Sequence, residues 1–217
     1  MNPNFQSPQS SPPGRMSQAE NRRYRRQSLL MAAMKTVARY DIQGATVERI
    51  CGEAGASRGL IAHYFESKEA LLLAALKGWF NTAFAIKQSI ADDPSQNAEQ
   101  KILRISTASF TAPAYSWEIA AAWQAFTNAS RHDRAFARSI RTASRNVRRL
   151  LEPLFEEAAK DAGVTLDPVL AARSLCALED GLWNSLATGK DDMKVSDAQK
   201  ACEQFIRGYI SRPINGE

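Results

Sequence analysis

The chain of 217 residues carries 28 Lys and Arg against 23 Asp and Glu, a formal net charge of +5 at pH 7. This length allows one large domain or two small ones, and the 44% hydrophobic and 24% charged residues are ordinary for a soluble globular protein. The three cysteines (Cys51, Cys176 and Cys202) are an odd number without metal-ligand spacing, so we expect neither a disulfide framework nor a zinc module. No apolar run approaches the roughly 18 residues of a membrane span.

The N-terminal segment changes in composition after about residue 16. Residues 1–16 are rich in Pro, Ser, Gln and Asn and lack an apolar core, so we expect a disordered leader and no signal peptide. Met16 is an alternative translation start. Residues 15–70 hold ten Lys or Arg and six Asp or Glu, which places most of the net charge in the first third of the chain.

A dense basic cluster lies within this first third, at Arg22, Arg23, Arg25 and Arg26. It is either a solvated basic arm or a set of contacts to phosphates.

Apolar residues recur at helical spacing along the rest of the chain, and no segment has the alternation typical of a strand. The sequence therefore predicts an all-α fold. Asp41–Gly44 is the expected stop of the first helix, and Pro153 should kink a long one. In chain order, we expect helices over about residues 17–40, 47–53, 58–65, 68–91, 95–110, 116–130, 133–162, 168–188 and 196–209.

Residues 46–65 have the pattern of a helix-turn-helix unit, in which a glycine-containing turn joins two short helices. Thr46 and Ser57 are the expected N-cap residues, while Ile61 and Phe65 should face the core. In such units the second helix enters the major groove of DNA and the first lies across the backbone. The same spacing also occurs in small helical proteins that do not bind DNA.

Exposed side chains of the second helix are suited to base contacts. Arg58 is the expected base reader, because one guanidinium can bond guanine O6 and N7 together. Gly59 would let the helix approach the duplex closely, and Leu60 or Ala62 is suited to a thymine methyl group.

Three further side chains are the expected phosphate contacts. Tyr64 offers a hydroxyl, Thr46 a hydroxyl near a helix N-terminus, and Lys68 an ammonium at another helix N-terminus. The complete expected DNA-contact set is Arg22, Arg23, Arg25, Arg26, Thr46, Ser57, Arg58, Gly59, Leu60, His63, Tyr64 and Lys68.

Three neighbouring stretches carry a resemblance to a known family: ATVERI at residues 45–50, AGASRG at 54–59 and HYFESKEAL at 63–71. Together they resemble the DNA-binding domain of the TetR family of bacterial repressors. The resemblance implies an all-α homodimer with a three-helix N-terminal domain, and an operator-binding repressor released by a small molecule. The expected division of the chain is a leader (1–16), a helix-turn-helix domain (17–66), a ligand-binding and dimerisation domain (67–212) and a tail (213–217).

Two further stretches are similar to the BetI subgroup, whose members regulate the conversion of choline to glycine betaine. The first is GLIAHYF at residues 59–65, and the second combines DGLW at 180–183 with ATGK at 187–190. Residues 111–131 match that subgroup less well. The resemblance implies choline or a related quaternary ammonium compound as the effector. The alternative is a TetR-type repressor of an unrelated catabolic or efflux gene that responds to a different ligand.

Aromatic residues gather in the part of the chain that would enclose an effector. Aromatic faces hold quaternary ammonium groups by cation–π attraction, and Glu118 or Glu179 would supply a carboxylate. Any single aromatic at helical spacing is also readily explained as an ordinary core residue. The expected ligand-binding residues are Trp79, Phe84, Phe110, Trp117, Trp123, Phe126 and Trp183.

Two features of the C-terminal half concern surfaces. One helix carries arginines along a single face, and we interpret them as a solvated face with local ion pairs rather than a second nucleic-acid surface. Small residues in the last two helices allow close helix approach and suit a four-helix dimer interface. The arginines are Arg134, Arg138, Arg141, Arg145 and Arg148, and the small residues are Ala171, Ala172, Ala177 and Gly181.

The sequence offers no recognisable catalytic site. His63 and His132 are the only histidines, and no glycine-rich phosphate loop, paired-carboxylate motif or metal-ligand spacing is present. We therefore expect no enzyme, no cofactor and no metal. The TetR resemblance implies instead a cytoplasmic bacterial homodimer that binds palindromic double-stranded operator DNA and a small effector. A helical protein-interaction module with a basic arm is the more distant alternative.

Overall fold

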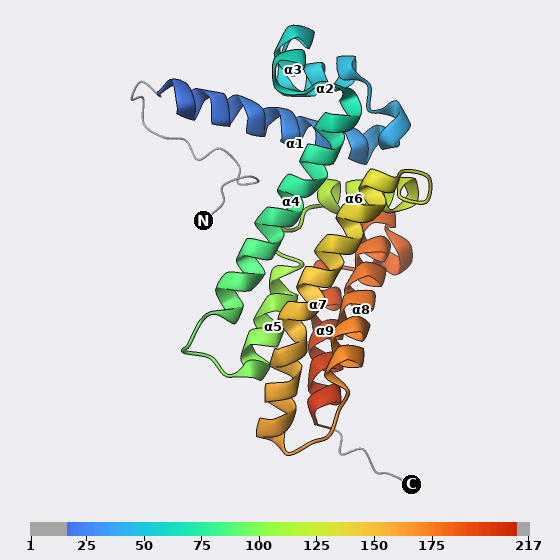
Figure 1. Ribbon diagram of the computed structural model, residues 1–217. Coiled ribbons are helices and arrows are strands. Elements are labelled where there is room, and N and C mark those ends of the chain that lie inside the picture. The colour runs from blue at the N-terminus through green and yellow to red at the C-terminus, as the bar shows by residue number, and fades with distance from the viewer. Residues whose placement is uncertain (1–16, 212–217) are drawn as a thin grey trace. The chain divides into compact units, whose positions relative to one another are not determined.

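The computed structural model describes residues 17–211, and every regular element in that range is helical, as the sequence predicts (Figure 1). The expected leader over residues 1–16 and the tail over 213–217 lie outside the described residues. The helices are α1 (Gln18–Gly44), α2 (Val47–Ala54), α3 (Arg58–Tyr64), α4 (Lys68–Ala91), α5 (Ala98–Ala108), α6 (Trp117–Ala129), α7 (Arg134–Ala162), α8 (Pro168–Thr188), the 3-10 turn η1 (Lys190–Asp192) and α9 (Val195–Ile210).

Helix α1 begins with a capping box, in which Ser17 Oγ accepts from the backbone N–H of Glu20 and the Glu20 carboxylate accepts from that of Ser17. The expected stop at Asp41 is present only as a local break. Asp41 has φ 61° and ψ 175°, and helical turns resume after it as far as Gly44. The carboxylate of Asp41 accepts from the N–H of Ile42 at 2.6 Å, a local hydrogen bond that holds the backbone at this break.

The described residues form two compact units. The first comprises residues 17–82 and 117–140, and within it α1 packs against α2 and α6. Its core includes the fully buried side chains of Leu30, Met34 and Phe126. The expected domain boundary between residues 66 and 67 lies within this unit and stays a prediction.

The second unit comprises residues 83–116 and 141–211, and within it α9 packs against α5 and α8. Its core includes Ile105, Leu151 and Phe155, none of which is exposed. Helix α7 is continuous across the exposed Pro153.

Capping residues explain where the later helices begin. The expected start of α5 at residue 95 is three residues too early, because the Asp93 carboxylate accepts from both the N–H and the hydroxyl of Ser95 and holds a turn there. The helix starts instead after Asn97, which forms a capping box with Gln100. Asp167 caps α8 as expected, accepting from two backbone N–H groups.

Candidate nucleic-acid interface and effector site

The helix-turn-helix unit has the caps that its sequence predicts. Thr46 Oγ1 accepts from the N–H of Arg49 at the start of α2, and Ser57 Oγ accepts from the N–H of Leu60 at the start of α3. Gly55 ends α2 in the left-handed conformation, with φ 60° and ψ 35°, which a residue without a Cβ adopts at little cost. Burial of Ile61 orients α3, so its opposite face is left to solvent.

Arg58 lies on this exposed face and is paired with α2. Its Nη2 atom is 2.6 Å from Oε1 of Glu48, and the side chains of the pair are 71% and 54% exposed. A base contact by this guanidinium, as the sequence predicts, would require it to leave the Glu48 carboxylate. Gly59 and His63 are exposed beside it, while Leu60 is half-buried.

No side chain crowds Gly59. A Cβ placed there would meet only Ser57 Oγ, at 3.9 Å. The absence of a side chain at this position is therefore not required by packing within the chain.

The expected phosphate contacts differ in how freely they can move. Lys68 is 26% exposed, and its Nζ donates to the carbonyl of Ile42 at 3.3 Å, which ties the start of α4 to the end of α1. Tyr64 is half-buried, with its ring 5.0 Å from that of His63 in an edge-on arrangement. Thr46 is committed as an N-cap acceptor, and its hydroxyl also donates to the Glu48 carboxylate.

The basic cluster is helical rather than an extended arm. Arg22, Arg23, Arg25 and Arg26 all lie in α1 and are exposed. The Arg25 guanidinium donates to the Asn21 side chain at 3.0 Å, and that of Arg26 lies 5.4 Å from the centre of the Phe65 ring. Helix geometry thus sets the spacing of these charges, which an unstructured arm would leave variable.

Arg49 helps to hold the helix-turn-helix unit in place, a role that was not expected from the sequence. Its guanidinium donates to the Gly44 carbonyl at 2.8 Å and lies 4.2 Å from the centre of the Tyr40 ring. These contacts join α2 to the end of α1. A second link is the Glu53 carboxylate, which forms ion pairs with Lys35 and Arg39.

The expected ligand-binding aromatics are divided between the two units, and within each unit only some of them contact one another. In the first unit, the Trp123 ring lies 5.8 Å from those of Trp79 and Phe80. Phe126 packs edge-on against Phe136, with no exposed surface, as a core residue does. Trp117 is 49% exposed.

In the second unit, the aromatic group consists of Phe110, Tyr115 and Trp183. Tyr115 lies 5.4 Å from Trp183 and 6.2 Å from Phe110, measured between ring centres. Burial raises the pKa of Tyr115 above its ordinary value. Phe84, in the same unit, is half-buried.

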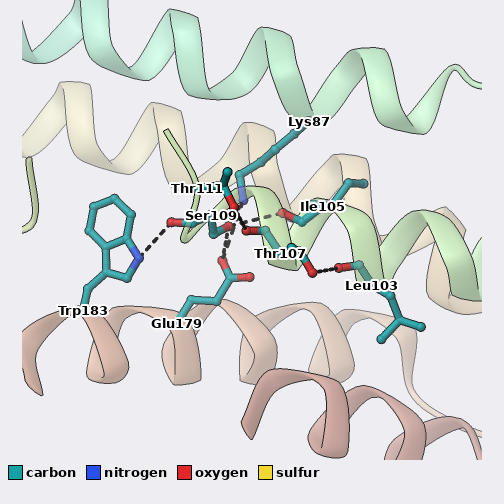
Figure 2. Close-up of polar contacts among 8 residues, drawn as sticks. All are labelled: Lys87, Leu103, Ile105, Thr107, Ser109, Thr111, Glu179 and Trp183. Carbon is teal, nitrogen blue, oxygen red and sulfur yellow. Dashed lines mark hydrogen bonds and ion pairs between the residues drawn. The ribbon is translucent and has the colours of Figure 1, made fainter. Parts of the chain in front are cut away.

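A buried polar network lies next to Trp183 (Figure 2). The sequence indicated two of its members, Glu179 and Trp183, but not Lys87 or Ser109. Lys87 on α4 donates to the hydroxyl of Ser109, which donates to Oε2 of Glu179 on α8 at 3.0 Å. The Lys87 ammonium is 3.7 Å from the same carboxylate oxygen. The indole N–H of Trp183 donates to the Ser109 carbonyl at 3.1 Å, so four side chains converge on the end of α5.

Lys87 was not among the expected residues, although a signal was present. It lies four residues after Ala83 and three before Ile90, which places a charged residue on the apolar stripe of its helix. A lysine in that position needs either an exit to solvent or a buried partner, and only the tertiary structure identifies Glu179 as that partner.

Two thiols share this environment. Burial, reinforced by the negative charge of Glu179, raises the pKa of Cys176 to about 12 and that of Cys202 to about 11. Both cysteines therefore remain thiols near neutral pH and are weak nucleophiles.

A separate groove of about 380 Å³ lies between α5 and α9. It is lined mainly by polar residues, and none of the expected ligand-binding aromatics contributes to it. Its lining is Leu103, Ser106, Thr107, Ser196, Gln199, Lys200, Glu203 and Ile206.

The arginine face of α7 is solvated as expected, with four of its five members exposed and Arg148 half-buried. The expected local ion pairs are absent among the side chains that the structure describes, which exclude that of residue 191. The sequence analysis also expected four small residues of α8 to suit a dimer interface. Two of them, Ala171 and Ala172, are buried inside the protomer and cannot serve such an interface, so the expectation is wrong for these two. Ala177 and Gly181 are exposed.

Residues 17–211 contain no group of three or more His, Cys, Asp or Glu that could hold a metal ion. In the same range, no helix is long and apolar enough to cross a membrane.

Two capped helices around a left-handed glycine, with an exposed arginine at the start of the second, define a helix-turn-helix DNA-binding protein. Residues 29–75 match the bacterial regulatory proteins of the tetR family, and residues 98–211 match the C-terminal domain of BetI-type transcriptional repressors. The chain belongs to the TetR family of transcriptional regulators and carries a BetI-type repressor C-terminal domain. The predicted family and subgroup are therefore confirmed.

Curated relatives agree over most of the chain. The HTH-type transcriptional regulator BetI of Vibrio vulnificus is 31% identical over 189 residues, which is 86% of this chain and 93% of the relative. BetI of Escherichia coli K12 is 28% identical over 192 residues, covering 86% and 94%.

Solved structures share the fold. A transcriptional regulator from Pseudomonas aeruginosa PAO1 has a TM-score of 0.74 at 29% identity, over 87% of this chain and 91% of that one. A regulator from Saccharomonospora viridis, solved in complex with choline, has a TM-score of 0.75 at 23% identity, over 88% and 97%.

Proposed function

We propose that this transcriptional repressor holds a palindromic operator through the α3 helices of two subunits and releases it when a quaternary ammonium compound such as choline binds. Operator binding is supported above all by the exposed face of α3, where Arg58 and Gly59 follow the N-cap Ser57. A guanidinium at the start of a recognition helix can read guanine, and its surface pair with Glu48 costs little to exchange.

Two observations support a quaternary ammonium effector. The C-terminal domain matches BetI-type repressors over residues 98–211, and a regulator of the same fold was solved with choline. In this chain, the carboxylate of Glu179 lies on α8 one turn before Trp183, whose ring packs against Tyr115. A carboxylate beside aromatic rings is the chemistry that recognises such a cation.

The homodimer is proposed to form through α8 and α9. Leu170 is 51% exposed on α8, and the exposed Ala177 and Gly181 lie on the same side of that helix at seven- and eleven-residue spacing. An exposed leucine with small residues on one helix face suits close packing against a second copy.

Binding of the full-length protein to DNA tests the proposal. A palindrome obtained by in vitro selection is titrated by fluorescence anisotropy at several salt concentrations, with shuffled DNA as the control. We expect tight, steeply salt-dependent binding to the palindrome. Equal affinity for shuffled DNA would remove the operator-binding function and favour the helical interaction module.

Effector release is then measured on the bound complex with choline, betaine aldehyde and an unrelated lipophilic cation, each against equal sodium chloride. We expect choline at millimolar concentration to release the operator. Release by the lipophilic cation alone would favour the alternative effector, namely a different ligand of a repressor that controls an unrelated gene. The repressor function itself would stand.

The dimer is tested by light scattering of Gly181→Arg. We expect this variant to be monomeric and to lose operator affinity, because a guanidinium would have to be desolvated at the interface. Ala162→Arg, at the exposed end of α7, is the control and should remain dimeric.

A further inference from the structure

A cation already occupies the carboxylate that the proposed effector would need. Lys87 is 7% exposed, and its ammonium lies 3.7 Å from Oε2 of Glu179, with Ser109 bridging the two by hydrogen bonds (Figure 2). A buried ammonium without such a partner would be costly, so Lys87 and Glu179 stabilise each other.

The surroundings of this pair are those of a cation site. Trp183, Tyr115 and Phe110 form a continuous aromatic group. The Trp183 indole donates to the carbonyl of Ser109, whose hydroxyl donates to Glu179, so Ser109 links this group to the carboxylate. The cation–π pairs found within residues 17–211 involve arginines of the first unit, not Lys87. Lys87 therefore uses the carboxylate without stacking on the rings that a quaternary ammonium would prefer.

We infer that Lys87 is the resident counter-cation of Glu179, and that a quaternary ammonium effector binds by displacing the Lys87 ammonium from this carboxylate. The inference rests on the proposed function for the identity of the effector. Lysine suits the task because its ammonium sits on a flexible four-carbon stem and can swing away while the helix stays in place.

Displacement has a measurable consequence for affinity. An effector that binds only when Lys87 is detached has its apparent affinity reduced by the fraction of molecules in that state. Hydrogen bonds to a buried charged group keep that fraction small, so removal of the ammonium should tighten cation binding by about ten- to a hundredfold.

The test uses calorimetric titration of the full chain with choline chloride and with tetramethylammonium chloride, in constant total salt. The variants are Lys87→Met, Lys87→Gln and Glu179→Gln. Lys87→Gln retains an amide donor for Ser109 and serves if Lys87→Met does not fold. Lys77→Met, an exposed lysine on the same helix, is the matched control.

We expect both Lys87 variants to bind the two cations about ten- to a hundredfold more tightly than the unmodified protein, Glu179→Gln to lose binding, and Lys77→Met to be unchanged. Unchanged or weaker binding by the folded Lys87 variants would overturn the inference and make the pair a purely structural one. Absence of binding to every variant would overturn it as well.

The same data separate this inference from the proposed effector. If choline releases the operator from the unmodified protein but Lys87→Gln binds no tighter, only the displacement is wrong. Suppose instead that Lys87→Gln binds tetramethylammonium more tightly than the unmodified protein does, that Glu179→Gln does not bind it, and that choline leaves the unmodified complex intact. The displacement then stands and the effector assignment fails.

Discussion

Arg58 of α3 and Glu48 of α2 form an ion pair, with 2.6 Å between Nη2 and Oε1. Hydrogen bonds to its own backbone N–H and to Thr46 hold the pKa of Glu48 below its ordinary value, with a smaller contribution from Arg58. Both side chains are mostly exposed, so water screens their attraction. The pair can therefore orient the guanidinium in the free protein and still yield it to a base.

Replacement of Arg58 by alanine should weaken operator binding by about 1–3 kcal/mol and relax selectivity at one base pair. The measurement is anisotropy with the palindrome and a set of single-base-pair variants. Arg141→Ala, an exposed arginine on α7, is the control and should bind like the unmodified protein. Equal losses on operator and shuffled DNA would show that Arg58 contacts phosphate rather than a base.

Lys68→Ala should weaken binding to all DNA sequences alike and flatten the dependence of log affinity on log salt by about one phosphate contact per subunit. The same substitution removes the bond to the Ile42 carbonyl, so the free energy of unfolding should also fall, by about 0.5–1.5 kcal/mol. Salt titrations and urea unfolding measure the two effects. A loss confined to the operator would contradict the phosphate assignment.

Gly59→Ala should separate folding from DNA binding. The added Cβ meets only Ser57 Oγ at 3.9 Å, and alanine favours helix more than glycine, so stability should rise by up to about 1 kcal/mol. Operator affinity should nevertheless drop, because the methyl group would hold α3 away from the duplex. Thermal unfolding and anisotropy are compared on the same sample, and unchanged affinity would show that α3 does not approach DNA closely at this residue.

Gly44→Ala should destabilise the junction between α1 and α2 by about 1–3 kcal/mol, since its Cβ would lie 2.9 Å from that of Tyr40, whose ring stacks with Arg49. Urea unfolding measures the change. Gly52→Ala is the control: no atom lies within 4 Å of its added Cβ, and the free energy of unfolding should rise by about 0.5–1 kcal/mol. Stability of Gly44→Ala equal to that of Gly52→Ala would refute the steric argument.

Cys202 should resist alkylation in the folded protein. Burial raises the pKa of its thiol from 9.0 to about 11, which lowers the thiolate fraction near neutral pH about a hundredfold. Cys176, with a pKa of about 12, should react more slowly still. Timed iodoacetamide labelling followed by mass spectrometry, in buffer and in urea, gives the rates. Labelling of Cys202 at the same rate in both conditions would show that the thiol is not protected.

Local features of the chain were predictable in detail. Thr46, Ser57 and Asp167 cap the helices that their sequence contexts indicate, because a cap bonds to an N–H only two or three residues away. The start of α5 was misplaced for a related reason: Asp93 and Asn97 are both good capping residues, and the hydrogen bonds to Ser95 give Asp93 a turn instead of a helix.

Most helices, the helix-turn-helix unit and the family could be predicted from the chain alone, because each of these depends on residues that are close neighbours in it. The bridge that Ser109 makes between Lys87, 22 residues away, and Glu179, 70 residues away, emerges only from the folded chain. It likewise decided that Phe126 packs against Phe136 as a core residue and that Trp183 packs against Tyr115. Burial and ion pairing are set by residues from distant segments, and helical periodicity carries no information about which segments meet.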